Sequence, residues 1–239
     1  MRKLLRKYFA IGGLALLLGG GGLLAGVESG YITTGHEMAV RKIPTSHKVI
    51  ALTFDDGPST ATTPQLLKVL HAKAAKATFF VLGTSIQKAP ALLSAIAEGG
   101  HEVASHSFTH RFSNTVPKEE LFQELDKTAA LIAGVAARPT LFRPPGGGYN
   151  DNLVRELKQH GYTTVLWSVD PRDWERRSPA QISSFVIEKA APGAIVLLHE
   201  GECAAGTPEA VAKIIDTLRS QGYEFVTVSE LLQYYEVRD

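Results

Sequence analysis

The chain has 239 residues, of which 44% are hydrophobic, and its formal net charge is +1 at pH 7. This length and apolar content are enough to build one large core, so we expect a single main domain. The near-neutral charge gives no reason to propose nucleic acid as a partner, because nucleic-acid-binding domains usually carry a basic patch or stripe. With one cysteine, Cys203, a disulfide within the chain is excluded.

The N-terminal segment, residues 1–27, has the pattern of an export signal or a membrane anchor. Four basic side chains precede an uncharged stretch, Tyr8–Val27, which is long enough to cross a bilayer as a helix. No convincing small-x-small cleavage site follows it, which favours an uncleaved anchor with the C-terminal domain outside the cytoplasmic membrane. The many glycines weaken the segment as a helix, so cleavage stays open. We therefore expect an extracytoplasmic protein, either membrane-anchored or secreted.

Residues 28–47 are polar and lack a sustained apolar period, which predicts a linker. Strand and helix patterns alternate after it, so we expect one domain over residues 48–239. Short apolar segments predict seven strands, at Val49–Phe54, Thr78–Leu82, Glu102–Ser105, Thr140–Arg143, Thr163–Val169, Ala194–His199 and Glu224–Val228.

The segments between the predicted strands carry helix start and stop signals. Thr63-Pro64, Ser178-Pro179 and Thr207-Pro208 each place a capping side chain before a proline at the first helical position. Gly161 and Gly222 fit a reversal of the chain into the next strand. This repetition predicts an α/β fold with a parallel sheet, and about seven strands indicate a distorted or incomplete (β/α) barrel.

Five side chains at or near the carboxyl ends of these strands would make one hydrolytic metal site if they met. The rim formed by such strand ends is where barrel active sites are built. Two imidazoles and one carboxylate on a divalent ion leave positions open for a water and a substrate carbonyl oxygen. Hydrolysis also needs a base and an acid. The five residues are Asp55, Asp56, His106, His110 and His199.

The adjacent aspartates can share such a site. Neighbouring side chains on a strand point to opposite faces, but a turn at Gly57-Pro58 lets Asp56 ligate while Asp55 faces the bound water. The metal charge would favour the ionised form of Asp55, which a base requires. His106 and His110 have a spacing that suits either a helical turn or a compact loop. Each pattern alone is more typical of an ordinary turn or surface pair, and only their joint occurrence indicates a site.

Three further clusters follow or end predicted strands: Arg143-Pro144-Pro145-Gly146-Gly147-Gly148, Asp170-Pro171-Arg172-Asp173-Trp174 and Leu197-Leu198-His199. With these clusters the chain resembles the polysaccharide deacetylase family, carbohydrate esterase family 4. The resemblance runs from about Lys48 to about Leu232, and all five family motifs can be placed.

The resemblance implies a role for each matching residue. Asp55 would be the general base and His199 the general acid. Arg143 would pair with Asp55 and hold it in place, whereas Asp173 would hydrogen-bond His199 and favour its protonated form. The implied metal ligands are Asp56, His106 and His110.

The resemblance also implies a substrate-binding set, with one departure. Trp174 and Leu197 would wall the pocket for the acetyl methyl, and the N–H of Gly146, after Pro145, would face the developing oxyanion. The family usually has an aromatic residue at position 146. Glycine keeps the backbone donor, but it removes a wall and loosens the loop. We therefore expect a more open groove there, and Gly146→Tyr should alter apparent substrate affinity or preference far more than turnover.

The expected activity is metal-dependent removal of N-acetyl groups from an amino-sugar polysaccharide of peptidoglycan or chitin type, with release of acetate. Zinc is the expected ion, with cobalt or nickel as alternatives. An extracytoplasmic location makes peptidoglycan the most accessible substrate. An O-acetyl esterase acting on a polysaccharide such as acetylxylan is the alternative enzyme. A non-catalytic carbohydrate-binding protein is disfavoured, because binding alone needs no acid and base beside the metal ligands.

Two residues near these motifs are better explained by structure than by chemistry. Trp167 lies within an apolar strand pattern and is expected in the core. Asp170 is expected to order the Asp-Pro-Arg-Asp turn through its own backbone.

Overall fold

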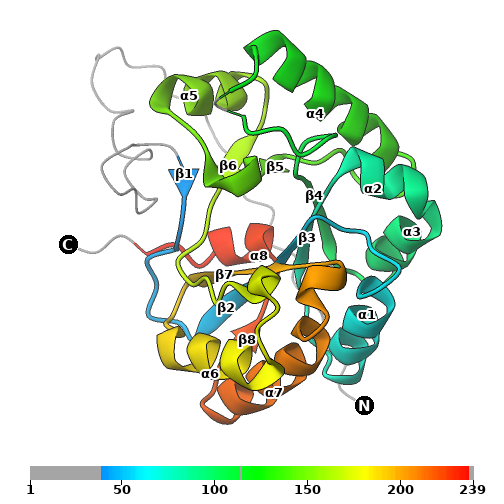
Figure 1. The fold of residues 1–239 in the computed structure, drawn as a ribbon. Coiled ribbons are helices and arrows are strands. Elements are labelled where there is room, and N and C mark those ends of the chain that lie inside the picture. The colour runs from blue at the N-terminus through cyan, green and yellow to red at the C-terminus, as the bar shows by residue number, and fades with distance from the viewer. Residues whose placement is uncertain (1–38, 114, 237–239) are drawn as a thin grey trace, which may run out of the picture.

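The computed structural model describes residues 39–113 and 115–236. They form an eight-stranded sheet in the order β1-β6-β5-β4-β3-β2-β7, with β8 paired to β2 (Figure 1), and each pairing of named strands is parallel. The predicted α/β fold with an incomplete barrel is confirmed. The strands are β1 (Ala39–Val40), β2 (Val49–Asp55), β3 (Thr78–Val81), β4 (Glu102–Ser105), β5 (Leu141–Phe142), β6 (Thr163–Val165), β7 (Ala194–His199) and β8 (Glu224–Phe225).

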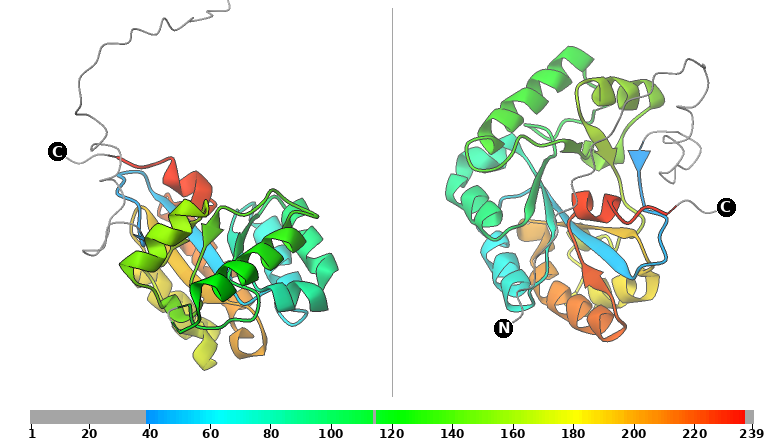
Figure 2. Two further views of the ribbon diagram at one scale, coloured as in Figure 1. Left: turned by 90° about the horizontal axis from the view of Figure 1, so that it is seen from above. Right: turned by 180° about the vertical axis from the view of Figure 1, so that it is seen from behind.

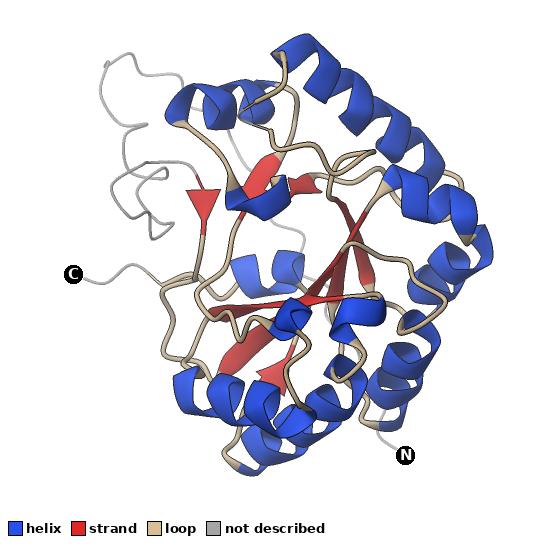
Figure 3. Ribbon diagram, in the orientation of Figure 1, coloured by secondary structure: helices blue, strands red, loops and turns tan. Residues whose placement is uncertain are grey.

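Helices cover most of the outside of the sheet (Figure 3), and α8 lies in front of the strands in the view from behind (Figure 2). The α-helices are α1 (Thr63–Ala72), α2 (Gly83–Lys88), α3 (Pro90–Glu98), α4 (Lys118–Ile132), α5 (Asp151–Gln159), α6 (Pro179–Lys189), α7 (Thr207–Ser220) and α8 (Val228–Leu232). Three short 3-10 turns complete the described elements: η1 (Pro145–Gly147), η2 (Asp173–Glu175) and η3 (Glu202–Ala204).

The central strand β2 contributes residues both to the apolar core and to the candidate site. Its even-numbered residues pack in the apolar cluster between the sheet and the outer helices. Val49 and Ala51 face the other way, into a smaller apolar cluster that α8 helps to fill. Thr53 and Asp55 continue the alternation on that same side, toward the carboxyl end of the strand. The inside of the barrel is therefore apolar at one end and polar at the rim.

The chain after β6 links the two ends of the sheet. Val169 forms a parallel bridge with Val196 of β7, and the N–H of Ser168 donates to the Ile195 carbonyl at 3.0 Å. The predicted strand Thr163–Val169 is therefore interrupted after Val165. The Leu166 carbonyl accepts a side-chain hydrogen bond from Arg143 instead of pairing with a neighbouring strand.

The sheet begins upstream of Lys48, within the segment expected as a linker. Ala39 and Val40 are buried and pair with Thr164 and Val165 of β6. A strand of two residues is too short to show an apolar period. The predicted signal or anchor, residues 1–27, lies outside the described residues. Within residues 39–113 and 115–236, no helix has the length and apolar character needed to span a membrane.

The helix start signals have different outcomes. Ser178 caps α6 as predicted, in a reciprocal capping box with Gln181. Thr63 and Thr207 are the first residues of their helices, one position after the N-cap, and do not serve as caps, so that part of the prediction is wrong. Their hydroxyl groups hydrogen-bond Glu200 and Asp173 beside the candidate site.

Candidate functional site

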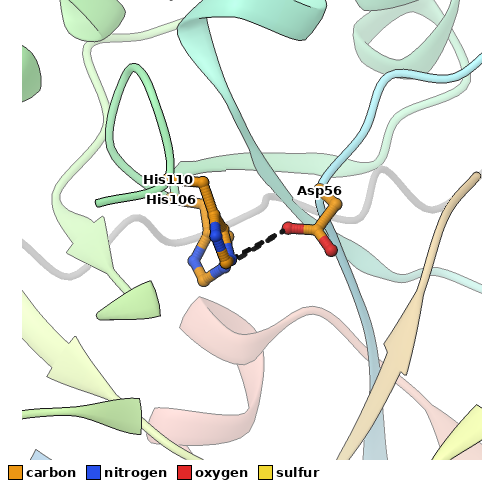
Figure 4. Close-up of side chains that lie close together, drawn as sticks. All are labelled: Asp56, His106 and His110. Atoms are coloured by element: carbon orange, nitrogen blue, oxygen red, sulfur yellow. Dashed lines mark ion pairs between the residues drawn. The ribbon is translucent and has the colours of Figure 1, made fainter. Parts of the chain in front are cut away.

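Asp56, His106 and His110 converge on one point (Figure 4), with one ligand atom from each within 4.8 Å of the others. The Oδ1 atom of Asp56 lies 3.6 Å from Nε2 of His106 and 3.4 Å from Nε2 of His110. This oxygen is buried and has no hydrogen-bonding partner within the described chain. A buried carboxylate oxygen without a partner costs free energy, and two facing imidazoles complete a donor set that fits a divalent cation.

Unusual backbone conformations bring these three side chains together. Asp56 follows β2 directly and has a φ of 74°, and His110 has a φ of 63°. His106 directly follows β4, and the chain then turns at Ser107, whose φ is 73° and whose hydroxyl accepts from the His110 N–H at 3.1 Å. The two histidines therefore lie on a compact loop, one of the two arrangements that their spacing allows.

Glu124 on α4 holds in place the loop of residues 106–112, which we call the histidine loop. Its carboxylate accepts hydrogen bonds from the N–H groups of Phe108 and Thr109, each at 3.2 Å, and also from the Thr109 hydroxyl. Hydrogen bonds to a charged acceptor are stronger than neutral ones. The loop that presents His110 is thus tied to a regular helix.

The surroundings of His106 select the form of imidazole that binds metals. Its Nδ1 lies 2.7 Å from the carbonyl oxygen of Arg143. A carbonyl can only accept, so Nδ1 carries the proton and Nε2 presents its lone pair toward Asp56. Burial lowers the pKa of His106 to about 3, which keeps the ring neutral at physiological pH.

Arg143 is fully buried and orients Asp55. It donates to Asp55 Oδ1 at 2.6 Å and to the Thr53 hydroxyl at 2.8 Å through Nη1, and to the Leu166 carbonyl at 3.1 Å through Nη2. Its guanidinium also lies 4.0 Å from the ring centroid of Phe80. The buried cation is therefore surrounded by acceptors and an aromatic face, and one carboxylate oxygen of Asp55 is fixed.

The second oxygen of Asp55 faces His106. Oδ2 lies 3.7 Å from Nε2 of His106. Burial raises the pKa of Asp55, and the opposing charges of Arg143 and His199 do not cancel that effect, so the pKa lies above its usual range. A cation held by Asp56 would favour the ionised form.

Asp173 connects His199 to the start of α7. Its Oδ1 lies 2.8 Å from His199 Nδ1, and its Oδ2 accepts from the His199 N–H at 2.8 Å and from the Thr207 hydroxyl at 2.6 Å. Burial works to lower the pKa of His199, but the hydrogen bond and charge of Asp173, together with Asp55 and Asp56, outweigh burial and raise it. The arrangement favours a protonated imidazole.

Sequence reasoning missed Glu200, which packs behind the aspartate turn. Its N–H donates to the Asp55 carbonyl at 2.9 Å, and its carboxyl group is hydrogen-bonded to the Thr63 hydroxyl. A β-carbon on Gly57 would lie 1.5 Å from Glu200 Oε2, so the turn needs glycine to make room. Burial raises the pKa of Glu200 to about 8. The sequence signal that could have identified Glu200 was its position, as a polar residue directly after the strand that ends in His199.

The residues expected to contact substrate lie in different environments. Trp174 in η2 is 45% exposed, whereas Leu197 and Pro145 are buried. Gly146 has a φ of 62°, and a β-carbon there would lie 2.5 Å from the ring of Phe112. The structure therefore differs from the expected open groove, because an aromatic ring from the histidine loop lies against this glycine. Phe112 was not singled out in the sequence.

Of the two residues expected to be structural, Asp170 behaves as predicted and Trp167 does so in part. Trp167 is partly buried and packs against the apolar cluster inside the barrel. Asp170 Oδ1 accepts a hydrogen bond from the N–H of Arg172 at 2.8 Å, which orders the turn before η2.

The chain matches a family model and several curated proteins. The family model described as Polysaccharide deacetylase matches residues 42–165. A curated peptidoglycan-N-acetylglucosamine deacetylase of Bacillus cereus is 41% identical over 209 residues, which is 86% of this chain and 95% of that relative. Two of the other curated relatives are longer: the chain covers 41% of the peptidoglycan-N-acetylmuramic acid deacetylase PdaC of Bacillus subtilis, at 39% identity, and 39% of the peptidoglycan-N-acetylglucosamine deacetylase PgdA of Listeria monocytogenes, at 40% identity.

Solved structures show the same fold. The crystal structure of the Bc1960 peptidoglycan N-acetylglucosamine deacetylase has a TM-score of 0.79 at 32% identity, covering 84% of this chain and 95% of that one. A carbohydrate esterase family 4 pseudoenzyme from Bacillus anthracis has a TM-score of 0.77 at 30% identity, covering 83% and 70%. The extent of these matches shows that the chain belongs to the polysaccharide deacetylase family.

Proposed function

We propose that this protein removes N-acetyl groups from the amino sugars of a cell-wall glycan of peptidoglycan or chitin type, with release of acetate and formation of a free amine. The observation that carries the proposal is the pairing of a base and an acid at one rim. Asp55 and His199 are register partners at the carboxyl ends of the neighbouring strands β2 and β7. Asp55 also lies beside the convergent metal ligands.

The metal would be held by Asp56, His106 and His110. A divalent ion there supplies Lewis-acid polarisation of the amide carbonyl and lowers the pKa of a water molecule. We propose zinc, because two imidazoles and a carboxylate suit it, although cobalt and nickel accept similar donors. The partnerless oxygen of Asp56 and the neutral ring of His106 support a resident cation.

The protein groups around the metal would divide the proton transfers between them. Asp55 accepts a proton from the attacking water while Arg143 keeps its other oxygen in place. The N–H of Gly146 donates to the oxyanion that develops from the carbonyl. His199, kept protonated by Asp173, gives its proton to the amine nitrogen as the C–N bond breaks.

The remaining substrate contacts and the cellular location are part of the same proposal. Trp174 is exposed at the rim beside Asp173 and would contact the sugar, and Leu197 and Pro145 would line the acetyl end. A segment of signal or anchor type at residues 1–27 would place the domain outside the cytoplasmic membrane, where peptidoglycan is accessible.

The pseudoenzyme among the similar structures makes a non-catalytic, carbohydrate-binding role the relevant rival. The chain has a carboxylate and an imidazole, each with its own buried partner, next to the proposed ligand set. Binding alone would not require these two partnerships. The geometry therefore favours catalysis.

Acetate release by the purified full chain tests the proposal. The substrates are peptidoglycan, chitin oligomers and acetylated xylan, each with chelator and then with zinc, cobalt or nickel restored. We expect acetate from the N-acetylated glycans, loss of activity on chelation and recovery with a divalent ion. Release from xylan alone would favour an O-acetyl esterase, and glycan binding that ignores chelator without any acetate would favour the non-catalytic role.

A further inference from the structure

Phe112 exposes a large apolar surface beside the candidate metal site. The residue is 53% exposed, and it is one of three exposed large hydrophobic residues in the described chain. Its ring centroid lies 6.2 Å from that of His110, with an edge-to-face arrangement. An exposed aromatic ring is unremarkable by itself, but this one touches a proposed metal ligand and the turn that carries Gly146.

The backbone fixes this position. The Phe112 carbonyl accepts hydrogen bonds from the N–H of Thr115 at 2.9 Å and from its hydroxyl at 2.8 Å. On the other side of Phe112, the His110 N–H is bonded to Ser107. The ring is therefore presented from a loop that is tied down both before and after it.

Two aromatic rings close on the glycine pair of the Pro-Pro-Gly-Gly-Gly turn. A β-carbon on Gly146 would lie 2.5 Å from Phe112, and one on Gly147 would lie 2.7 Å from Trp167. The two glycines have φ values of 62° and 67°, which a residue with a side chain adopts only at a cost. The turn is shaped to receive the Phe112 ring, and an aromatic side chain at position 146 has no room while that ring is in place.

We infer that Phe112 is a substrate-binding residue, against whose exposed face the sugar that carries the reacting N-acetyl group packs. This inference rests on the proposed function. The carbon–hydrogen face of a pyranose ring is apolar and gains dispersion and burial free energy on an aromatic surface. Phe112 touches Gly146, whose N–H is proposed to face the oxyanion, so a sugar bound there lies next to the reacting amide. The aromatic surface beside Gly146 therefore comes from the histidine loop, and the missing side chain of Gly146 makes space for it.

Steady-state kinetics on chitin oligomers separate this role from a structural one. Phe112→Ala is expected to raise KM about tenfold, because the variant loses the free energy gained when roughly half of a phenylalanine side chain is buried against the sugar. The value of kcat should stay within about twofold. Phe112→Tyr keeps the flat ring and should retain a wild-type KM, whereas Phe112→Leu keeps bulk without the flat face and should not. Val135→Ala removes another exposed apolar side chain, away from the site, and is the matched control.

Zinc content must be measured for each variant, because Phe112 also contacts a proposed ligand. An unchanged KM in Phe112→Ala, or a rise in KM that follows loss of zinc, would overturn the inference. The fraction of each variant that is retained on insoluble peptidoglycan measures substrate binding without turnover. If the wild type releases no acetate, the proposed function fails. In that case, weaker retention of Phe112→Ala than of the wild type at equal zinc content still supports sugar binding by Phe112. Equal retention of the two proteins overturns it.

Discussion

At the scale of single residues, two adjacent aspartates have different surroundings and therefore different proposed roles. Asp55 is fixed by the buried Arg143, whereas the next residue, Asp56, has a partnerless buried oxygen that faces two imidazoles. The candidate roles could be predicted from residue types and their order. The partners that orient them, such as Thr53 and Thr207, could not, because their contacts join residues far apart in the chain.

Asp173→Asn should alter the pH dependence of turnover. The folded pKa of His199 is raised, so its acid form persists until the pH rises through that pKa and is lost above it. Removing the negative charge of Asp173 lowers the pKa of His199, and the alkaline fall in kcat should move to lower pH. A pH profile of kcat measures this shift. An unchanged alkaline limb would mean that His199 is not the acid.

Glu200→Gln should remove a pH dependence of stability. Burial raises the folded pKa of Glu200 from 4.5 to about 8, so the folded state binds the extra proton in this window. Folding stability therefore falls as pH rises, by up to about 1.4 kcal/mol per pH unit. Denaturant titrations of chelator-treated wild type and variant, between pH 5 and 8, compare the two slopes. Parallel curves would contradict a neutral buried carboxyl group.

At the scale of elements, strand β2 was predictable because its apolar run and its terminal aspartate are both visible in the sequence. Strand β1 was not, because two residues carry no period. The loop that carries Phe112 is the clearest limit. Its position against Gly146 depends on positive φ values and on Glu124 of α4, neither of which spacing alone indicates.

Gly146→Ala should destabilise the protein by about 1–3 kcal/mol, through the left-handed backbone and the overlap with Phe112. Gly161→Ala is the matched control, since Gly161 also has a positive φ but nothing within 4 Å of a β-carbon, and should cost about 1 kcal/mol. Chemical denaturation gives both values. In a Phe112→Ala background the excess cost at Gly146 should shrink. Equal costs at the two glycines would show that Phe112 does not crowd the turn.

At the scale of the whole molecule, the fold was predictable because repeated strand–helix units of this length have few arrangements. A parallel sheet then brings the strand ends, and with them Asp55, His106 and His199, to a common rim. The interruption after β6 was not predictable, because it depends on backbone carbonyls that turn toward Arg143.

Metal binding should stabilise the folded protein as a whole. Zinc at about 1,000 times its Kd adds about 4 kcal/mol, which raises Tm by on the order of 10 °C for a chain of this size. Differential scanning calorimetry with chelator and with zinc measures the shift. Asp56→Ala should abolish it, whereas Asp170→Ala, which removes a turn carboxylate away from the ligands, should leave it intact. A zinc-dependent shift that survives Asp56→Ala would place the ion elsewhere.

The most direct measurement is the release of acetate and of new amines from peptidoglycan by the wild type and by Asp55→Asn, both with a measured equivalent of zinc. The wild type should form one amine for each acetate. The variant should lose activity by about 10²–10⁴-fold, the contribution typical of an acid or base, at equal zinc content. Turnover by Asp55→Asn at the wild-type rate, or no acetate from the zinc-loaded wild type on any glycan, would contradict metal-dependent deacetylation at this rim.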